Sequence, residues 1–181
     1  MEDAAQDRWV FGYGSLMWRP GFPFIDRRRA TLHGRRRAFC IYSVHHRGTY
    51  ARPGLVLGLA PGGATRGVAY HVSAKDWPET FAYLRDREQP TETYVEAWRA
   101  VKVDGLGPVD TLVFLSDPNH PQWAGALSLD RQAELIDGAT GLSGRNIDYL
   151  RDLVVHLREE RITDGGMERL LAMIEAREAG R

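Results

Sequence analysis

The sequence has few of the features that mark secreted, membrane-spanning or nucleic-acid-binding proteins. Its 181 residues include a single cysteine, Cys40, so no intrachain disulfide can form and a cysteine-based zinc site lacks its ligands. Twenty-four basic residues balance twenty-four acidic ones, which leaves no net charge to attract nucleic acid or an anionic membrane. No window approaches the roughly 18 apolar residues of a membrane span, and the acidic residues 1–7 do not resemble a signal peptide. We therefore expect a cytoplasmic protein with neither a membrane nor a nucleic-acid partner.

The composition is that of a packed globular protein. Hydrophobic residues make up 43% of the chain, charged residues 27% and aromatic residues 10%. The length suits one domain, so we expect a single domain over residues 1–181, with a core at 8–125 and helices at 126–181. Arginines cluster at residues 27–29 and 35–37, and we expect them to form a solvated face.

Short candidate strands follow one another through the first two thirds of the chain. They are rich in β-branched and aromatic residues and are separated by glycine and proline, at 9–13, 38–43, 55–60, 67–73, 97–103 and 109–115. Regular alternation of strands and helices, which builds a parallel sheet, is not seen. We therefore predict an α+β fold with a small, mostly antiparallel β-barrel and flanking helices.

The C-terminal part of the chain predicts helices with recognisable first residues. Apolar residues recur at spacings of three and four, as on the buried face of a helix. Ser128 is expected to cap a helix at 129–137 and Asn146 one at 147–161. Either Thr163 or Asp164 is expected to cap the last helix.

A further helix, at 76–89, carries an acidic residue on its apolar face. Asp76 and Glu79 have the spacing of a capping box, and Pro90 ends the helix. At about 100° per residue, Glu88 lies on the same stripe as three large apolar residues, Trp77, Phe81 and Leu84. Desolvation and the negative end of the helix dipole would both raise the pKa of this carboxyl. The alternatives are that Glu88 pairs with a nearby arginine or turns into solvent.

A glycine-rich turn follows the first predicted strand. Residues 9–16 read Trp-Val-Phe-Gly-Tyr-Gly-Ser-Leu, so a buried strand ends where a ligand can approach the backbone. Free N–H groups in such a turn suit an anion. The third glycine of a dinucleotide fingerprint is missing, as are the lysine and hydroxyl residue of a phosphate-binding loop. A simple tight turn or bulge is the alternative.

Taken together, these segments resemble the ChaC-type γ-glutamylcyclotransferases. The resemblance runs from residue 9 to about residue 157 and rests on ordered motifs at 9–18, 46–49 with 53–54, 67–70, 83–84 with 87–88, and 143–146 with 149–150. His45 replaces the family's aspartate before His-Arg-Gly, and residues 89–93 differ from the glycine-containing stretch that often follows the catalytic glutamate. These departures concern the choice of substrate.

The resemblance implies a fold, a reaction and a set of site residues. The fold is a compact cyclotransferase barrel with flanking helices, and the reaction cleaves glutathione to 5-oxoproline and Cys-Gly without cofactor or metal. Glu88 would be the catalytic acid and base. The γ-glutamyl group would be bound by Val10, Phe11, Gly12, Tyr13, Gly14, Ser15 and Leu16, and we add Arg52 and Tyr94 as further contacts.

Two other functions remain open at this stage. The chain could act on other γ-glutamyl amines or γ-glutamyl amino acids, with the same chemistry. It could also be a non-catalytic γ-glutamyl-binding or regulatory domain that uses the same pocket. The sequence does not predict an oligomeric state.

Overall fold

The computed structural model describes residues 6–88 and 93–181, which form two compact units. The barrel unit contains the chain up to Arg37 together with Leu59–His120, and the helical unit contains Ala38–Gly58 with Pro121–Arg181. Two long strands, β2 (Asp26–Ser43) and β3 (Gly54–Val72), contribute residues to both units. The single domain expected over residues 1–181 stays a prediction.

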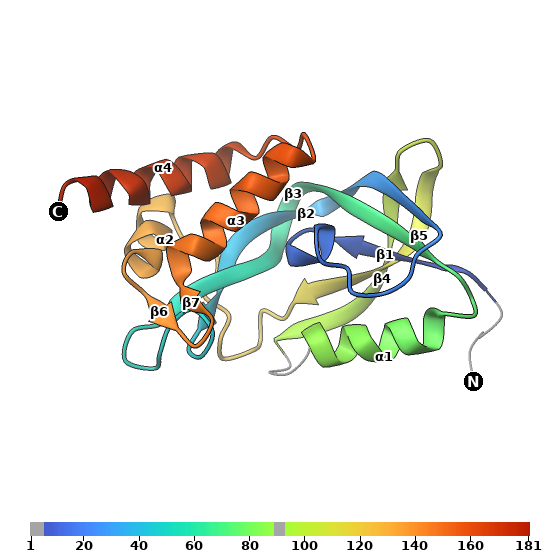
Figure 1. The fold of residues 1–181 in the computed structure, drawn as a ribbon, viewed down its shortest axis with the longest axis horizontal. Coiled ribbons are helices and arrows are strands. Elements are labelled where there is room, and N and C mark those ends of the chain that lie inside the picture. The colour runs from blue at the N-terminus through green and yellow to red at the C-terminus, as the bar shows by residue number, and fades with distance from the viewer. Residues whose placement is uncertain (1–5, 89–92) are drawn as a thin grey trace. The chain divides into compact units, whose positions relative to one another are not determined.

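Five strands close into a barrel in the order β1-β3-β2-β4-β5 (Figure 1). Strand β1 (Arg8–Gly12) pairs antiparallel with β3 and parallel with β5 (Gly107–Ser116). Strand β4 (Tyr94–Val103) pairs antiparallel with β5 along its whole length. The predicted small, mostly antiparallel barrel is therefore confirmed.

The strands are longer than the sequence pattern predicted. The candidates at 55–60 and 67–73 are one strand, β3, because Gly62 and Gly63 adopt φ values of +90° and +70° and continue the strand instead of ending it. The candidate at 38–43 is only the last part of β2. The first part of β2 was not predicted as a strand because it is rich in arginine. Only Ala30 and Leu32 face the core there, so the sequence shows little of the apolar alternation that marks a strand.

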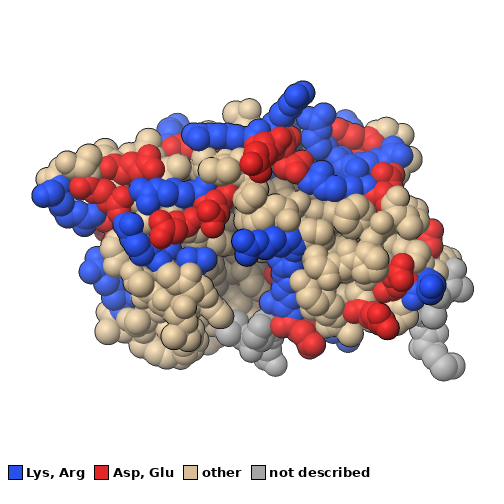
Figure 2. Space-filling view, in the orientation of Figure 1, with Lys and Arg blue, Asp and Glu red and all other residues tan. Residues whose placement is uncertain are grey.

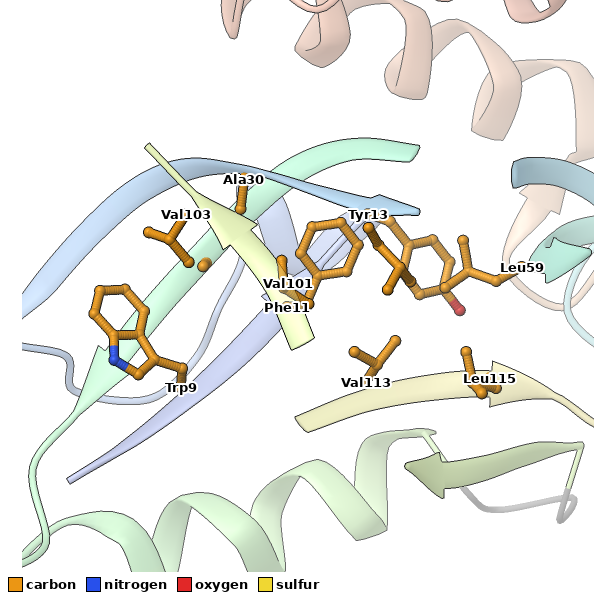
Figure 3. Packing of buried hydrophobic residues seen from close by; sticks show 11 residues of the cluster. Trp9, Phe11, Tyr13, Ala30, Leu59, Val101, Val103, Val113 and Leu115 are labelled. Carbon is orange, nitrogen blue, oxygen red and sulfur yellow. The ribbon is translucent and has the colours of Figure 1, made fainter. Parts of the chain in front are cut away.

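Side chains fill the interior of the barrel. Alternate side chains of the β1 segment point into the barrel. They are Trp9 and Phe11 of the strand and Tyr13 directly after it. They pack with residues of the other strands in Figure 3, Ala30, Leu59, Val101, Val103, Val113 and Leu115. The barrel is thus a packed core and not a channel, so a binding site has to lie at its edge or outside it.

Helix α1 (Trp77–Glu88) lies against β4 in the barrel unit (Figure 1). The Trp77 and Trp98 rings are 5.8 Å apart, and the Arg85 guanidinium pairs with the Glu96 carboxylate. The predicted stripe is confirmed for Trp77 and Leu84, which are buried, whereas Phe81 is only half-buried. The buried face is turned toward Thr80, which is also buried.

The beginning of α1 differs from a simple capping box. The Asp76 carboxylate accepts a 2.6 Å hydrogen bond from the Ser73 hydroxyl, and the backbone N–H of Trp77 donates to the Ser73 carbonyl. The residues ahead of the helix therefore help to fix its first turn.

Three helices and a small hairpin make up most of the helical unit. The helices are α2 (Leu129–Ile136), α3 (Asn146–Glu159) and α4 (Gly165–Ala179), and the hairpin strands are β6 (Thr140–Gly141) and β7 (Gly144–Arg145). Helix α4 contacts both α2 and α3. None of the helices in the described residues has the length and hydropathy that a membrane span requires.

Two of the three predicted helix caps are confirmed. The side chain of Ser128 accepts a hydrogen bond from the Arg131 N–H, and that of Asp164 accepts one from the Met167 N–H. The prediction for Asn146 is wrong, since Asn146 is the first residue of α3 and its side chain binds the backbone of Leu55.

Charged residues of both signs cover the outer surfaces of α3 and α4, as Figure 2 shows. The Arg151 guanidinium bonds the carboxylates of Asp148, Glu175 and Glu178. The Arg158 guanidinium bonds Glu168. Ion pairs between and within the helices therefore balance the charges of this face.

Candidate active site

The predicted glycine turn lies directly after β1. Gly14 precedes a short 3₁₀ helix, η1 (Ser15–Met17), in which the Met17 N–H donates to the Gly14 carbonyl at 2.9 Å. No described residue accepts a hydrogen bond from the backbone N–H of Gly14, Ser15 or Leu16. Within residues 6–88 and 93–181 the turn therefore presents unpaired N–H donors, as the first turn of any helix does.

Close packing explains the glycines around this turn. A Cβ atom on Gly12 would lie 3.0 Å from the Leu16 Cβ, and one on Gly67 of β3 would lie 2.2 Å from the Gly12 carbonyl oxygen. Glycine at both positions lets β1, β3 and η1 approach one another. The segment is thus a tight turn, which was one of the two interpretations of its sequence. It also has the free N–H groups that the other interpretation, an anion-binding turn, requires.

Side chains from β2 and β3 hold the turn in place. The Tyr70 hydroxyl lies 2.9 and 2.7 Å from the carbonyl oxygens of Leu16 and Met17. The Arg37 Nε donates to the Tyr13 carbonyl at 2.8 Å. The solvated face predicted for the arginine clusters is wrong for Arg37, which is only 7% exposed and supports the backbone of the turn.

Four of the predicted binding residues, Leu16 among them, have side chains buried within the barrel unit. Val10 and Phe11 have no exposed surface, and the Tyr13 ring lies in the barrel core. The Tyr13 hydroxyl donates to the Phe114 carbonyl at 3.1 Å. A contact between the Tyr13 side chain and a substrate stays a prediction, and this hydroxyl already has a partner in the core.

Glu88 is the last residue of α1, and its side chain is 17% exposed. Burial raises the pKa of the Glu88 carboxyl above its ordinary value, while the Arg87 charge acts in the opposite direction. The Arg87 Nε and the Glu88 Oε1 are 3.4 Å apart. Both the predicted burial and the alternative of an arginine partner are therefore present together.

Arg87 connects Glu88 to the glycine turn, which the sequence did not reveal. Its Nη2 donates to the Ser15 hydroxyl at 2.9 Å, and its Nη1 to the Tyr83 hydroxyl at 2.9 Å and the Pro20 carbonyl at 3.2 Å. Nη1 also donates to the Arg19 carbonyl. The sequence signal was the spacing of four between Tyr83 and Arg87, which places them on one helix face.

The remaining two predicted residues lie elsewhere in the chain. Tyr94 is the first residue of β4 and pairs with Ser116, after residues 89–92, which lie outside the described part. Arg52 belongs to the helical unit, where its Nη2 donates to the Asp137 carbonyl at 2.9 Å. The described contacts bring Glu88 and Ser15 together through Arg87, and the roles of Tyr94 and Arg52 stay predictions.

Comparison with known proteins identifies the family. The family model of the ChaC-like proteins matches residues 8–177. The chain belongs to the ChaC-like family. The matched part of this ChaC-like chain contains both the glycine turn and Glu88.

Curated relatives of this ChaC-like chain carry the names of enzymes. A glutathione-specific γ-glutamylcyclotransferase of Escherichia coli is 37% identical over 166 residues, 92% of this chain and 72% of the relative. Glutathione-specific γ-glutamylcyclotransferase 1 of Homo sapiens is 34% identical over 151 residues, 80% of this chain and 67% of the relative. A crystal structure of a yeast γ-glutamyl cyclotransferase specific to glutathione has a TM-score of 0.83 at 26% identity, covering 94% of this chain and 96% of that one.

Proposed function

We propose that this ChaC-like chain is a glutathione-specific γ-glutamylcyclotransferase, which converts glutathione to 5-oxoproline and Cys-Gly. The observation that supports the proposal is the link from Glu88 through Arg87 to Ser15, because it connects a buried carboxylate to a turn whose N–H groups suit an anion. The names of the relatives support the same reaction. The cytoplasmic location expected from the sequence belongs to this proposal.

The reaction joins two groups of one substrate molecule. The α-amine attacks the γ-carbonyl carbon, a C–N bond closes the five-membered lactam, and the C–N bond to the cysteine nitrogen breaks. Holding the substrate in a bent conformation supplies part of the roughly 7 to 11 kcal/mol that proximity can contribute. The protein therefore needs to bind the bent γ-glutamyl group and to move protons, and the proposed reaction uses no cofactor or metal.

Glu88 is proposed to carry the protons between the two nitrogens. The α-nitrogen enters as an ammonium with three protons and leaves as a lactam N–H with one. The cysteine nitrogen gains the two protons and leaves as an ammonium. The raised pKa makes the ionised Glu88 carboxylate a stronger base and its protonated form a donor nearer to neutral pH.

The glycine turn is proposed to bind the γ-glutamyl group. The unpaired N–H groups of Gly14, Ser15 and Leu16 suit either the α-carboxylate or the negative charge that develops on the carbonyl oxygen. In this proposal the buried residues Val10 and Phe11 support the turn from β1. The remaining predicted contacts to the substrate are Gly12, Tyr13, Arg52 and Tyr94.

The Glu88→Gln variant tests the assignment, because it keeps the shape of the side chain and removes the base. We expect release of 5-oxoproline from glutathione to fall by about 10² to 10⁴. Asp86→Asn is the matched control, an exposed acid on the same helix. A folded Glu88→Gln protein with near wild-type turnover would refute the role of Glu88.

A panel of γ-glutamyl compounds tests the substrate. We expect the wild-type protein to prefer glutathione to γ-glutamyl amines and to other γ-glutamyl amino acids. A preference for one of those would keep the chemistry and change the substrate class. Binding without turnover of any of them would instead support a non-catalytic domain.

A further inference from the structure

The guanidinium group of Arg87 uses all three of its nitrogens within the barrel unit. Nη2 contacts the Ser15 hydroxyl, Nη1 contacts the Tyr83 hydroxyl and two carbonyls after η1, and Nε faces the Glu88 carboxylate. Its side chain is 20% exposed, so the contacts are made largely out of bulk water. One side chain of α1 therefore holds both ends of the segment from Ser15 to Pro20.

We propose that Arg87 is a positioning residue that fixes the Glu88 carboxylate relative to the substrate-binding turn. The inference rests on the proposed function, since it assigns the turn and Glu88 to one reaction. Arg87 need not touch the reacting atoms in this role. It sets the position of the base and of the N–H donors with respect to each other.

Only an arginine can make this set of contacts. Its planar fork offers five N–H donors in fixed directions, whereas a lysine offers one compact ammonium group. Nη2 reaches the Ser15 hydroxyl and Nη1 reaches the Pro20 carbonyl, so a single ammonium cannot occupy both positions of the fork. Lysine keeps the charge beside Glu88 and loses the fork.

The backbone at Gly21, just after the carbonyls that Arg87 contacts, lies close to α1. Gly21 has a φ of +75°, and a Cβ atom there would lie 2.1 Å from the Tyr83 hydroxyl oxygen. Tyr83 thus packs directly on the chain after Pro20, while its hydroxyl accepts from Arg87. The close approach of this segment to α1 is an independent observation that the turn and the end of the helix are built as one unit.

Two variants distinguish the effect of the guanidinium fork from that of the positive charge. Arg87→Met removes both, and Arg87→Lys removes the fork but keeps the charge. We expect Arg87→Met to lower kcat/KM for glutathione by about 10²-fold, since displacements near 1 Å cost that much in a positioned reaction. We expect Arg87→Lys to lose on the order of 10-fold, because the same displacement is partly prevented by the remaining charge. Arg85→Met is the matched control, an arginine of the same helix that pairs with Glu96 away from the turn.

The pH dependence of kcat/KM distinguishes positioning from a general structural role. Arg87 is the charged group that acts on the pKa of Glu88 among the described residues, and it lowers that pKa. The rising, low-pH part of the kcat/KM profile reports ionisation of the base Glu88. This limb should therefore move to higher pH in Arg87→Met and stay near its wild-type position in Arg87→Lys. A lowered melting temperature alone would not move this limb.

The result that overturns the inference is a folded Arg87→Met protein with kcat/KM within about 3-fold of Arg85→Met and an unmoved pH limb. If Arg87→Met does not fold, a cycle of Arg87→Lys and Ser15→Ala decides. Losses in kcat/KM that are less than additive support the inference, and strictly additive losses overturn it. Failure of the proposed function is seen separately, as a wild-type protein that releases no 5-oxoproline from any γ-glutamyl compound.

Discussion

The side chain of Asn146 forms two hydrogen bonds with the backbone of Leu55, which lies 91 residues earlier in the chain. The Leu55 N–H donates to Oδ1 at 2.7 Å, and Nδ2 donates to the Leu55 carbonyl at 2.8 Å. The carboxamide therefore pairs with the start of β3 as a neighbouring strand would. Gly54 is required beside it, because a Cβ atom there would lie 2.5 Å from Oδ1.

Removing this pair should destabilise the protein. Asn146 has no exposed surface, so Asn146→Ala leaves the buried N–H and carbonyl of Leu55 without partners and should cost about 1 to 3 kcal/mol. Asn146→Asp should cost more, because a carboxylate oxygen would face the Leu55 carbonyl. Urea denaturation measures both, with the exposed Asn119→Ala as control. Equal stability of Asn146→Ala and Asn119→Ala would show that the pair contributes nothing.

Local patterns predicted the parts of the fold that depend on neighbouring residues. Ser128 and Asp164 cap the helices that follow them because the capping side chain and the backbone N–H that donates to it lie within one turn. Glu88 was placed on the buried stripe of α1 from the helix period alone. Asn146 had the same local option as Ser128 but found a distant partner, and no local pattern distinguishes the two.

The connections that build the candidate site could not be predicted, because they join segments far apart in sequence. Arg87 meets Ser15 across 72 residues, and Arg37 meets Tyr13 across 24. An arginine in a run of arginines, such as Arg37, has the same neighbouring sequence whether its side chain is solvated or donates to a backbone carbonyl. Only the closure of the barrel decides which backbone oxygens reach it.

Glu88 should reduce the stability of the folded protein at neutral pH. Its pKa is raised in the fold mainly by burial, so the ionised form is less favourable there than in the unfolded chain. The Glu88→Gln variant removes this penalty, and we expect it to melt at a higher temperature than the wild type at pH 7 while losing activity. Thermal unfolding at several pH values measures the difference.

The sign of the pH dependence follows from linkage. Below the ordinary glutamate pKa of 4.5 both states hold the proton, and the stability difference between Glu88→Gln and wild type should be at its smallest. As the pH rises from 4.5 toward the raised pKa, the folded state holds the proton longer and the wild type loses stability relative to the variant. If the wild type instead becomes more stable relative to Glu88→Gln over this pH range, the pKa of Glu88 is not raised.

Gly67→Ala should disturb the end of β1. The new Cβ atom would lie 2.2 Å from the Gly12 carbonyl oxygen and 2.9 Å from the Phe11 ring, so the two strands must move apart. Overpacking of this kind costs about 1 to 3 kcal/mol, and we expect activity to fall together with stability because η1 packs on Gly12. Gly165→Ala is the control, since no atom lies within 4 Å of its Cβ position. If Gly67→Ala melts like Gly165→Ala, the glycine is not needed for this packing.

Arg37→Met tests whether the arginine cluster supports the turn. Arg37 donates to the Tyr13 carbonyl at 2.8 Å and to the Arg66 carbonyl at 2.5 Å, and it is almost fully buried. Hydrogen bonds from a charged donor contribute about 1.5 to 3 kcal/mol, so the variant should lose roughly that much in urea denaturation. Arg29→Met, at an exposed position of the same strand, should change stability by less than about 0.5 kcal/mol. Equal effects of the two substitutions would mean that Arg37 behaves as a solvated residue, and the turn would then depend on Tyr70 and Arg87 for its support.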